Sequence, residues 1–175
     1  MYIGKTPTAV PIGTNDLADN IVTVSKLAST LDLSSNTITL PSGVGGKVLQ
    51  VVTDTATSGT VSTATSYFDI NLSLNITPSS TSNKIFLLYT GVNETNAQNS
   101  ALFVQMLRDS TQIAEHKSIN FANGGYYDSK SISKLDEPNS SSQITYKMQG
   151  KTDGTIAGFN IAGYLGTLTA YEIAG

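Results

Sequence analysis

The sequence predicts an all-β protein, an antiparallel jelly-roll-like β-sandwich with an extended N-terminal arm and a short stem. Charged residues make up only 13% of the chain, about half of the usual ~25%, and Ser and Thr take their place. Thr, Val and Ile are abundant, and β-branched side chains pack well on a pleated surface. Beyond residue 46, about nine or ten short apolar-polar runs follow one another with turn signals between them, as in a sandwich or a barrel.

Residues 1–46 predict an N-terminal attachment arm and a stem rather than a folded domain. Residues 1–14 hold Pro7 and Pro11 among small residues, and proline favours an extended chain over a helix. Tyr2 and Ile3 are the apolar anchors of this arm. Such an arm is either disordered or laid along another surface.

The stem, residues 15–46, carries one narrow apolar stripe. Ile21, Val24, Leu27 and Leu31 are spaced by three, three and four residues, which is a helical period. A stripe this short is not stable alone in water, so it favours burial against further copies of the chain or against a neighbouring domain. A glycine-rich joint at residues 43–46 then leads into the knob, residues 47–175.

The knob reads as a succession of strands. Strict alternation predicts strands at 67–76, 101–108 and 143–149, whereas continuous apolar runs predict buried strands at 48–52 and 84–92. Weaker patterns predict strands at 60–63, 111–116, 129–135, 155–164 and 168–173, with polar loops at 93–99 and 120–128. The expected core faces are Phe68, Ile70, Leu72, Leu74 and Ile76, then Leu102, Val104 and Met106, then Ile144, Tyr146 and Met148.

Composition excludes several classes of function. The net charge is −3, with a pI near 4.9 and no basic patch, so no nucleic acid is expected as a partner. The absence of Cys removes disulfides and thiol chemistry. No apolar run is long enough for membrane insertion, and the N-terminus has no secretory signal core. No cofactor and no metal are expected.

Tyr126 and Tyr127 are the candidate ligand-binding residues. They lie in a predicted Gly/Asn-rich loop, and an aromatic face beside polar groups is a common way to hold a sugar. The alternative is that one or both tyrosines pack at the sandwich rim or at a subunit interface.

A catalytic interpretation has weak support. The single histidine, His116, pairs with Glu115 or Asp109 only if the fold brings them together, and an ordinary strand histidine explains it equally well. Five acidic residues offer a carboxylate pair for glycoside hydrolysis, although they are placed by the pattern on turns or outward faces. We therefore expect no enzymatic activity. The five are Asp69, Asp109, Asp128, Asp136 and Glu137.

Three stretches carry a resemblance to a known family. They are residues 31–52, LDLSSNTITLPSGVGGKVLQVV, residues 76–86, ITPSSTSNKIF, and residues 168–173, LTAYEI. In this order they resemble structural fibre proteins of marine tailed bacteriophages, the cyanophages and their relatives. The resemblance implies a homotrimer with a fibrous stem and a knob similar to the trimeric jelly rolls of the tumour-necrosis-factor and C1q kind. In that family the leader motif occurs in tandem, whereas here it occurs once.

Pattern and resemblance together predict a virion protein that forms a short homotrimeric fibre. The arm then attaches to other phage structural proteins, the stem joins the copies, and the knob presents host-binding loops, as in a tail fibre or adhesin whose partner is a host surface glycan. The alternative is a capsid decoration or head-fibre protein with no ligand.

Overall fold

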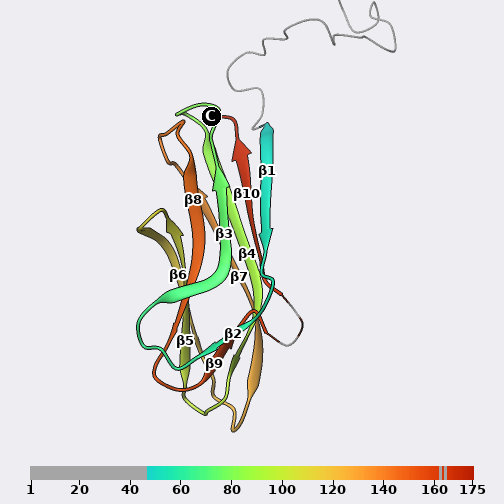
Figure 1. Ribbon diagram of the computed structural model, residues 1–175, viewed down its shortest axis with the longest axis vertical. Helices are drawn as coiled ribbons and strands as arrows, with labels where there is room; N and C mark the ends of the chain where they lie inside the picture. Colours follow the sequence, from blue (N-terminus) through green and yellow to red (C-terminus); the bar gives the residue numbers. More distant parts are fainter. Residues whose placement is uncertain (1–46, 162, 164) are drawn as a thin grey trace, which may run out of the picture. The chain divides into compact units, whose positions relative to one another are not determined.

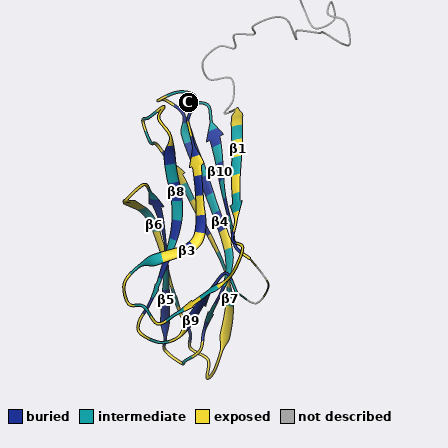
Figure 2. Ribbon diagram, in the orientation of Figure 1, coloured by how far each residue is buried: buried dark blue, intermediate teal, exposed yellow. Residues whose placement is uncertain are grey.

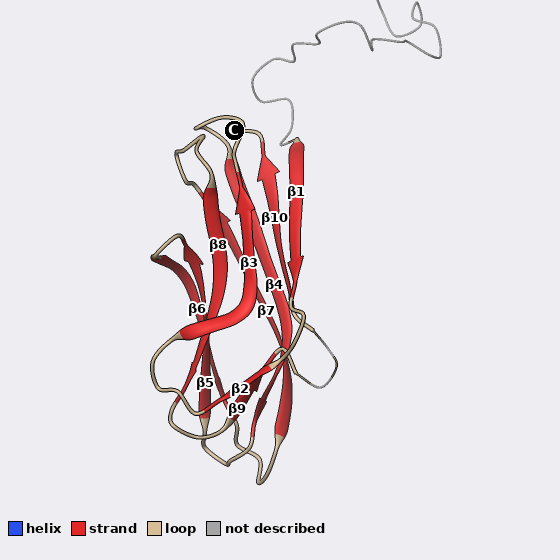
Figure 3. Ribbon diagram, in the orientation of Figure 1, coloured by secondary structure: helices blue, strands red, loops and turns tan. Residues whose placement is uncertain are grey.

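The computed structural model describes residues 47–161, 163 and 165–175, and these residues form strands joined by loops. The predicted arm and stem residues, Tyr2, Ile3, Pro7, Pro11, Ile21, Val24, Leu27 and Leu31, lie outside the described part. Among the described residues, no helix is long and apolar enough to cross a membrane. The prediction of an all-β sandwich is confirmed (Figure 3).

Ten strands make up the described part (Figure 1). They are β1 Val48–Thr55, β2 Thr60–Ser62, β3 Phe68–Ile76, β4 Lys84–Thr95, β5 Ala101–Arg108, β6 Thr111–Ile119, β7 Tyr126–Asp136, β8 Ile144–Thr152, β9 Ala157–Phe159 and β10 Thr167–Ile173.

The pairing of the strands is that of a jelly roll. One sheet has the order β1-β10-β4-β9-β2, with β7 paired to the other edge of β4, and the second has the order β3-β8-β5-β6. Leaving aside the short strands β2 and β9, the first strand pairs with the last, β3 with β8, β4 with β7, and β5 with β6. All these ladders are antiparallel. This nested pairing divides eight strands between two sheets, as two Greek keys do.

The core lies between the two sheets (Figure 2). Alternation places every second side chain inside, and in β3 the residues from Ile70 to Ile76 alternate between buried and exposed. The predicted core faces of β5 and β8 are also confirmed. The largest fully buried apolar side chains include Tyr89, Tyr146, Phe159, Ile70, Ile76, Ile85, Leu87, Leu102, Met106, Met148 and Leu168.

The prediction of a buried strand at 48–52 was wrong about burial. β1 exists, but it is an outermost strand of its sheet, and Val48 and Val51 are 52% and 54% exposed. Only Val52 of this run packs against the core. A continuous apolar run therefore marks a strand without showing how many of its faces are covered.

Three predicted boundaries were also displaced. β4 continues to Thr95, so the predicted loop at 93–99 starts later, and Asn93 and Thr95 are buried. β7 begins at Tyr126, so the predicted loop at 120–128 ends at Gly125. Of the described residues in the predicted strand at 155–164, only Ala157–Phe159 form a strand.

The strand registers define two ends of the sandwich. Val48, Ile173, Lys84 and the end of β7 lie together, and the backbone N–H of Ala174 donates to the carbonyl of Lys47 at 2.9 Å. We call this the proximal end, because the chain enters the described part here. Thr95 and Tyr126 pair at the opposite, distal end (Figure 1). Twelve residues of β4 join the two ends, a distance of about 36 Å at ~3.3 Å per residue.

Candidate functional site

A pocket of about 400 Å³ opens at the distal end, between β6 and β7. These two strands are the outermost strands of the two sheets on this side, so no further strand closes the sandwich over the pocket. Its lining comes from the end of β6, the connecting loop and the start of β7. The lining residues are Lys117, Ser118, Ile119, Asn120, Phe121, Ala122, Tyr126, Asp128 and Lys130.

The structure separates the two tyrosines that the sequence predicted as a pair. Tyr126 lines the pocket, whereas Tyr127 does not, because neighbouring residues of a strand point to opposite faces. Tyr127 lies opposite Glu94 on the outer side of the sheet. Both rings are accessible, with 47% and 56% of their surfaces exposed.

Phe121 is the functional candidate that the sequence analysis missed. It is 73% exposed, the highest value among the exposed large apolar residues of the described part, and it lines the pocket together with Tyr126 and Ile119. This exposed apolar cluster makes the pocket a candidate interaction surface. The sequence does offer one sign of Phe121: it is the only aromatic residue in the loop 120–125, which is otherwise polar or small and contains two glycines.

Asn120 fixes the loop that carries Phe121. Its side-chain amide is buried and donates to the carbonyls of Ala97 at 3.1 Å and Gly124 at 3.0 Å, while its Oδ1 accepts from the N–H of Ala122 at 2.8 Å. Its backbone pairs with the β4–β5 loop through Asn99 and Ser100. Asn120 therefore shapes the pocket floor and has little hydrogen-bonding capacity left for a ligand.

Replacing Asn120 with Ala is expected to destabilise the protein by about 1–2 kcal/mol, because buried backbone carbonyls lose their donor. Amide hydrogen exchange should accelerate in residues 96–100 and 120–125 and stay slow in β3 and β8. Exchange that is unchanged in both loops would show that they hold their shape without this side chain. Gln112→Ala, which removes one exposed hydrogen bond to the Glu115 carboxylate, is the matched control.

The polar groups of the pocket are of both signs. Asp128 forms an ion pair with Lys130, and Lys117 lies over the Phe103 ring, 5.3 Å from its centre. The Ser118 hydroxyl is buried with no hydrogen-bond partner among the described residues. Two accessible aromatic rings beside a carboxylate and an ammonium supply both stacking and hydrogen bonding for a polyhydroxylated ligand.

The predicted catalytic partners of His116 are not brought together with it. Glu115 and His116 are neighbours on β6 and point to opposite faces. Glu115 accepts a hydrogen bond from Gln112 at 2.9 Å, and Asp109 accepts one from the N–H of Thr145 at 3.0 Å. His116 instead lies opposite the core residue Val104 on the neighbouring strand, which agrees with the alternative that it is an ordinary strand histidine.

The candidate acids each have a separate partner. Asp69 accepts from Gln149 at 2.7 Å, and Glu137 lies 2.7 Å from the ammonium of Lys84. Asp128 is the one of the five that lines the distal pocket. Within the described residues, no group of three or more His, Cys, Asp or Glu side chains is placed to hold a metal ion.

The prediction that Asp136 lies on a turn or an outward face was wrong, because Asp136 is the last residue of β7 and is buried. Asp136 is 6% exposed, and it accepts from both the Arg108 guanidinium, at 3.0 and 3.1 Å, and the Tyr146 hydroxyl, at 2.6 Å. Burial, followed by this hydrogen bond, raises the pKa of Tyr146. The group joins β7 of one sheet to β5 and β8 of the other, so Asp136 acts in the stability of the sandwich.

A second hollow, of about 490 Å³, lies on the other open side of the sandwich near β1 and β3. Its polar groups are paired, as Asp128 and Lys130 are in the distal pocket: Lys147 lies 3.3 Å from Asp69, and the Asp54 carboxylate accepts from the backbone N–H of Ser73. It contains no aromatic side chain. The distal pocket is therefore the stronger candidate for recognition.

Comparisons with known proteins find similarity to solved structures only. No family model matches the chain, and no curated protein matches it. Three solved structures of infectious bursal disease virus are similar to part of this chain: the Gx strain (TM-score 0.43, 15% identity), a D431N mutant VP2 protein in derived T=1 particles (0.43, 16%) and a VP2 subviral particle (0.43, 17%). They cover 71%, 70% and 70% of this chain, which in turn spans only 38%, 36% and 37% of theirs.

Proposed function

We propose that this chain is a non-enzymatic bacteriophage virion protein, a short homotrimeric fibre whose knob binds a host surface glycan. In this proposal Tyr2, Ile3, Pro7 and Pro11 belong to the arm that contacts other phage structural proteins. The stripe Ile21, Val24, Leu27 and Leu31 joins three copies. The distal pocket faces the host.

The observation that carries the proposal is the separation of two ends along one sandwich. The chain enters at Lys47, and its last residues return beside that point at the proximal end. The exposed residues Phe121 and Tyr126 lie at the distal end. A domain held from one end and carrying an aromatic pocket at the other is suited to presentation of that pocket by a fibre.

Binding of the full-length protein to host cells and to a glycan array tests the proposal. Tyr126→Ala and Phe121→Ala are each expected to weaken binding by about 2- to 13-fold, since stacking on one aromatic ring contributes on the order of 0.5–1.5 kcal/mol. Tyr127→Ala removes an equally exposed tyrosine outside the pocket and should retain binding. All three variants must give circular dichroism spectra close to that of the wild type, so that a loss of binding is not caused by unfolding.

Equal losses in the Tyr126 and Tyr127 variants would contradict the assignment of the pocket. Absence of binding by the wild-type protein would contradict the adhesin proposal as a whole.

The second candidate is a capsid decoration or head-fibre protein that binds no ligand. It is favoured by the Asp128–Lys130 ion pair, because the charges inside the pocket already neutralise each other. Cryo-electron microscopy of the virion distinguishes the two: a location on the capsid lattice supports decoration, and a location at the tail tip supports adhesion.

A further inference from the structure

We propose that the outer face of the β1–β10–β4–β7 layer is the surface through which copies of this chain pack against one another. The inference rests on the self-assembly in the proposed function and assigns it a surface within the knob. It does not depend on glycan binding.

The outer face carries a continuous apolar row near the proximal end. The registers place Val51 of β1 opposite Tyr171 of β10, Tyr171 opposite Phe86 of β4, and Phe86 opposite Leu135 of β7. Val51 and Leu135 are 54% and 47% exposed, and the rings of Phe86 and Tyr171 lie 6.1 Å apart. Ile173 and Val48 extend the row toward the proximal end.

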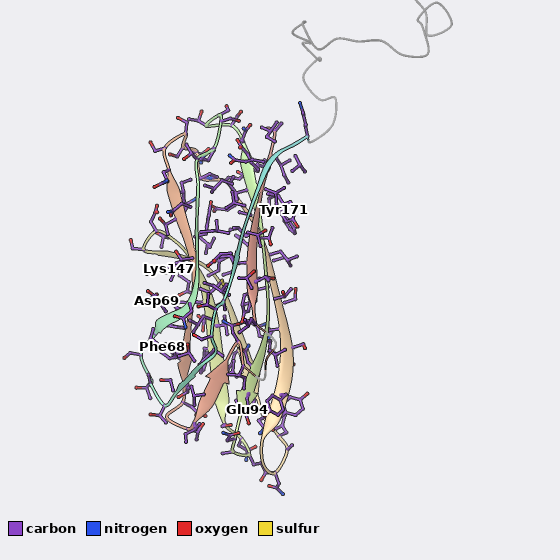
Figure 4. All side chains as sticks on the ribbon, turned by 45° about the vertical axis from the view of Figure 1, so that its right-hand side comes forward. Phe68, Asp69, Glu94, Lys147 and Tyr171 are labelled. Carbon is purple, nitrogen blue, oxygen red and sulfur yellow. The ribbon has the colours of Figure 1, made fainter. Side chains whose placement is uncertain are left out.

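The outer faces of the two layers differ in charge. Between Lys84 and Glu94, the outward residues of β1, β10, β4 and β7 are Ser, Thr or apolar. The outer face of the other sheet carries Asp69, Glu115, Lys117, Lys147 and Lys151. Figure 4 shows Tyr171 on one side of the sandwich and Asp69 and Lys147 on the opposite side. Charged side chains are depleted at the core of protein interfaces, so the uncharged face is the one expected to be covered.

A second copy of the chain fits this face for two reasons. An uncharged face can pack against its own copy without like-charge repulsion. The outer face of the other sheet carries five charged side chains, so two copies of that face would bring like charges together. Four strands at ~4.8 Å spacing and about seven residues at ~3.3 Å give a projected area of about 440 Å², a little over half of the ~800 Å² of accessible surface per partner in a stable interface.

The position of the row also favours a second copy. It lies at the proximal end, where the chain leads back to residues 1–46. Copies joined through the predicted stripe would hold their proximal ends at high effective concentration. A weak apolar contact between knobs then becomes sufficient.

Disulfide trapping tests the surface, because the natural chain contains no cysteine. Val51→Cys/Leu135→Cys places two thiols on the outermost strands of the face, roughly 14 Å apart within one chain, too far for an intramolecular disulfide. Oxidation of the full-length protein is expected to link chains covalently. Ser73→Cys/Glu115→Cys spans the outer face of the other sheet in the same way and should remain unlinked.

Light scattering of charge variants gives an independent result. Val51→Lys/Leu135→Lys should lower the mass of the assembly or increase hydrogen exchange in β1 and β10. Val61→Lys, at an apolar residue that is 65% exposed on β2, should change neither.

Two results would contradict the proposed packing surface without contradicting self-assembly. In the first, the protein is a multimer and both cysteine pairs link chains equally. In the second, it is a multimer, neither pair links chains, and the lysine variants keep the wild-type mass. A monomeric wild-type protein would contradict both the proposed self-assembly and the proposed packing surface.

Discussion

Glu172→Gln is expected to lower the free energy of unfolding by about 2–3 kcal/mol, because it replaces a buried carboxylate that accepts hydrogen bonds from all its neighbours. Glu172 is 1% exposed. Its Oε1 accepts from the backbone N–H of Ser79 at 2.6 Å, the Ser79 hydroxyl at 2.8 Å and the Asn83 amide at 2.5 Å. Its Oε2 accepts from Gln50 at 2.6 Å. A glutamine presents an NH₂ group to donors on one side or the other, so at least one buried donor loses its acceptor.

The carboxylate ties together the proximal end of the sandwich. Gln50 belongs to β1, Glu172 to β10, and Ser79 and Asn83 to the turn between β3 and β4. Loss of the acceptor is therefore expected to free the start of β1 before the rest of the sheet opens. Hydrogen exchange in residues 48–52 should rise more than exchange in β5 or β8.

The effect should depend on pH in a defined direction. Burial alone would raise the pKa of Glu172, but hydrogen bonds from Asn83, Gln50 and Ser79 outweigh it and hold the pKa below its usual range. A lowered pKa in the folded state stabilises the protein above the unfolded-state pKa of ~4.3, and this stabilisation is lost as the pH falls through the folded-state pKa. The stability gap between wild type and Glu172→Gln should therefore narrow from about pH 7 to about pH 3.

Urea unfolding of both proteins across this pH range measures the gap. Glu137→Gln is the control, because Glu137 is exposed and its ion pair with Lys84 is at the surface; its unfolding should stay close to wild type. A gap that is constant with pH would show that folding does not shift the pKa of Glu172, and a gap that widens as the pH falls would show that the carboxyl is protonated in the folded protein.

The strands that could be predicted best are those with one covered and one open face. In β3 the apolar residues from Ile70 to Ile76 alternate with Asn and Ser, and the burial follows that alternation. The period of two is a direct consequence of strand geometry, so the sequence alone was sufficient for these strands. The nested pairing was predicted only as a fold type, because period two contains no information about which strand lies beside which.

Burial at the edges and between the sheets could not be predicted in the same way. Val48 and Val51 are apolar yet exposed because they lie on the outer face of the outermost strand β1, and Asp136 is acidic yet buried because Arg108 and Tyr146 meet it from the other sheet. Glu172 had a usable signal, since Leu168, Ala170 and Glu172 share one face of β10. Its donors, however, come from segments about 90 and 120 residues away.

The candidate site was predicted in part. Tyr126 was named from an aromatic residue beside glycines, and the structure places it in a pocket. Phe121 and Asn120 were missed, because a loop has no period and the hydrogen bonds of Asn120 reach another loop. Which of the two tyrosines faces the pocket depends on where β7 begins, and strand boundaries are the least certain part of a sequence pattern.

Phe159→Ala is expected to destabilise the protein by about 3–5 kcal/mol, the usual cost of removing a fully buried aromatic ring. Phe159 has no exposed surface, and its ring packs edge-to-face on Phe68 with centres 5.5 Å apart. The ring also lies directly over Gly150 of β8, where an added Cβ would come 2.5 Å from Cε1. A glycine inside a strand often marks such a close approach.

The close approach makes Gly150 and Phe159 an energetically coupled pair. Gly150→Ala alone is expected to cost about 1–3 kcal/mol, because the new methyl group overpacks the core. In the Phe159→Ala background the same methyl group enters the space that the ring has left, so Gly150→Ala should there cost far less or stabilise. The double-mutant cycle should give a coupling energy on the order of 1–3 kcal/mol.

Urea unfolding of the four proteins measures the cycle, and Phe159→Leu replaces Phe159→Ala if the alanine variant does not fold. Gly124→Ala is not a suitable control because of its positive φ of 98°. Ser73→Ala, at an exposed position on the neighbouring strand β3, should be additive with Phe159→Ala. Additive costs for Gly150→Ala and Phe159→Ala would show that the ring does not lie over the glycine. The packing of the Phe159 ring on Phe68, together with the backbone ladder to β2 and β4, would then be what holds the three-residue strand β9.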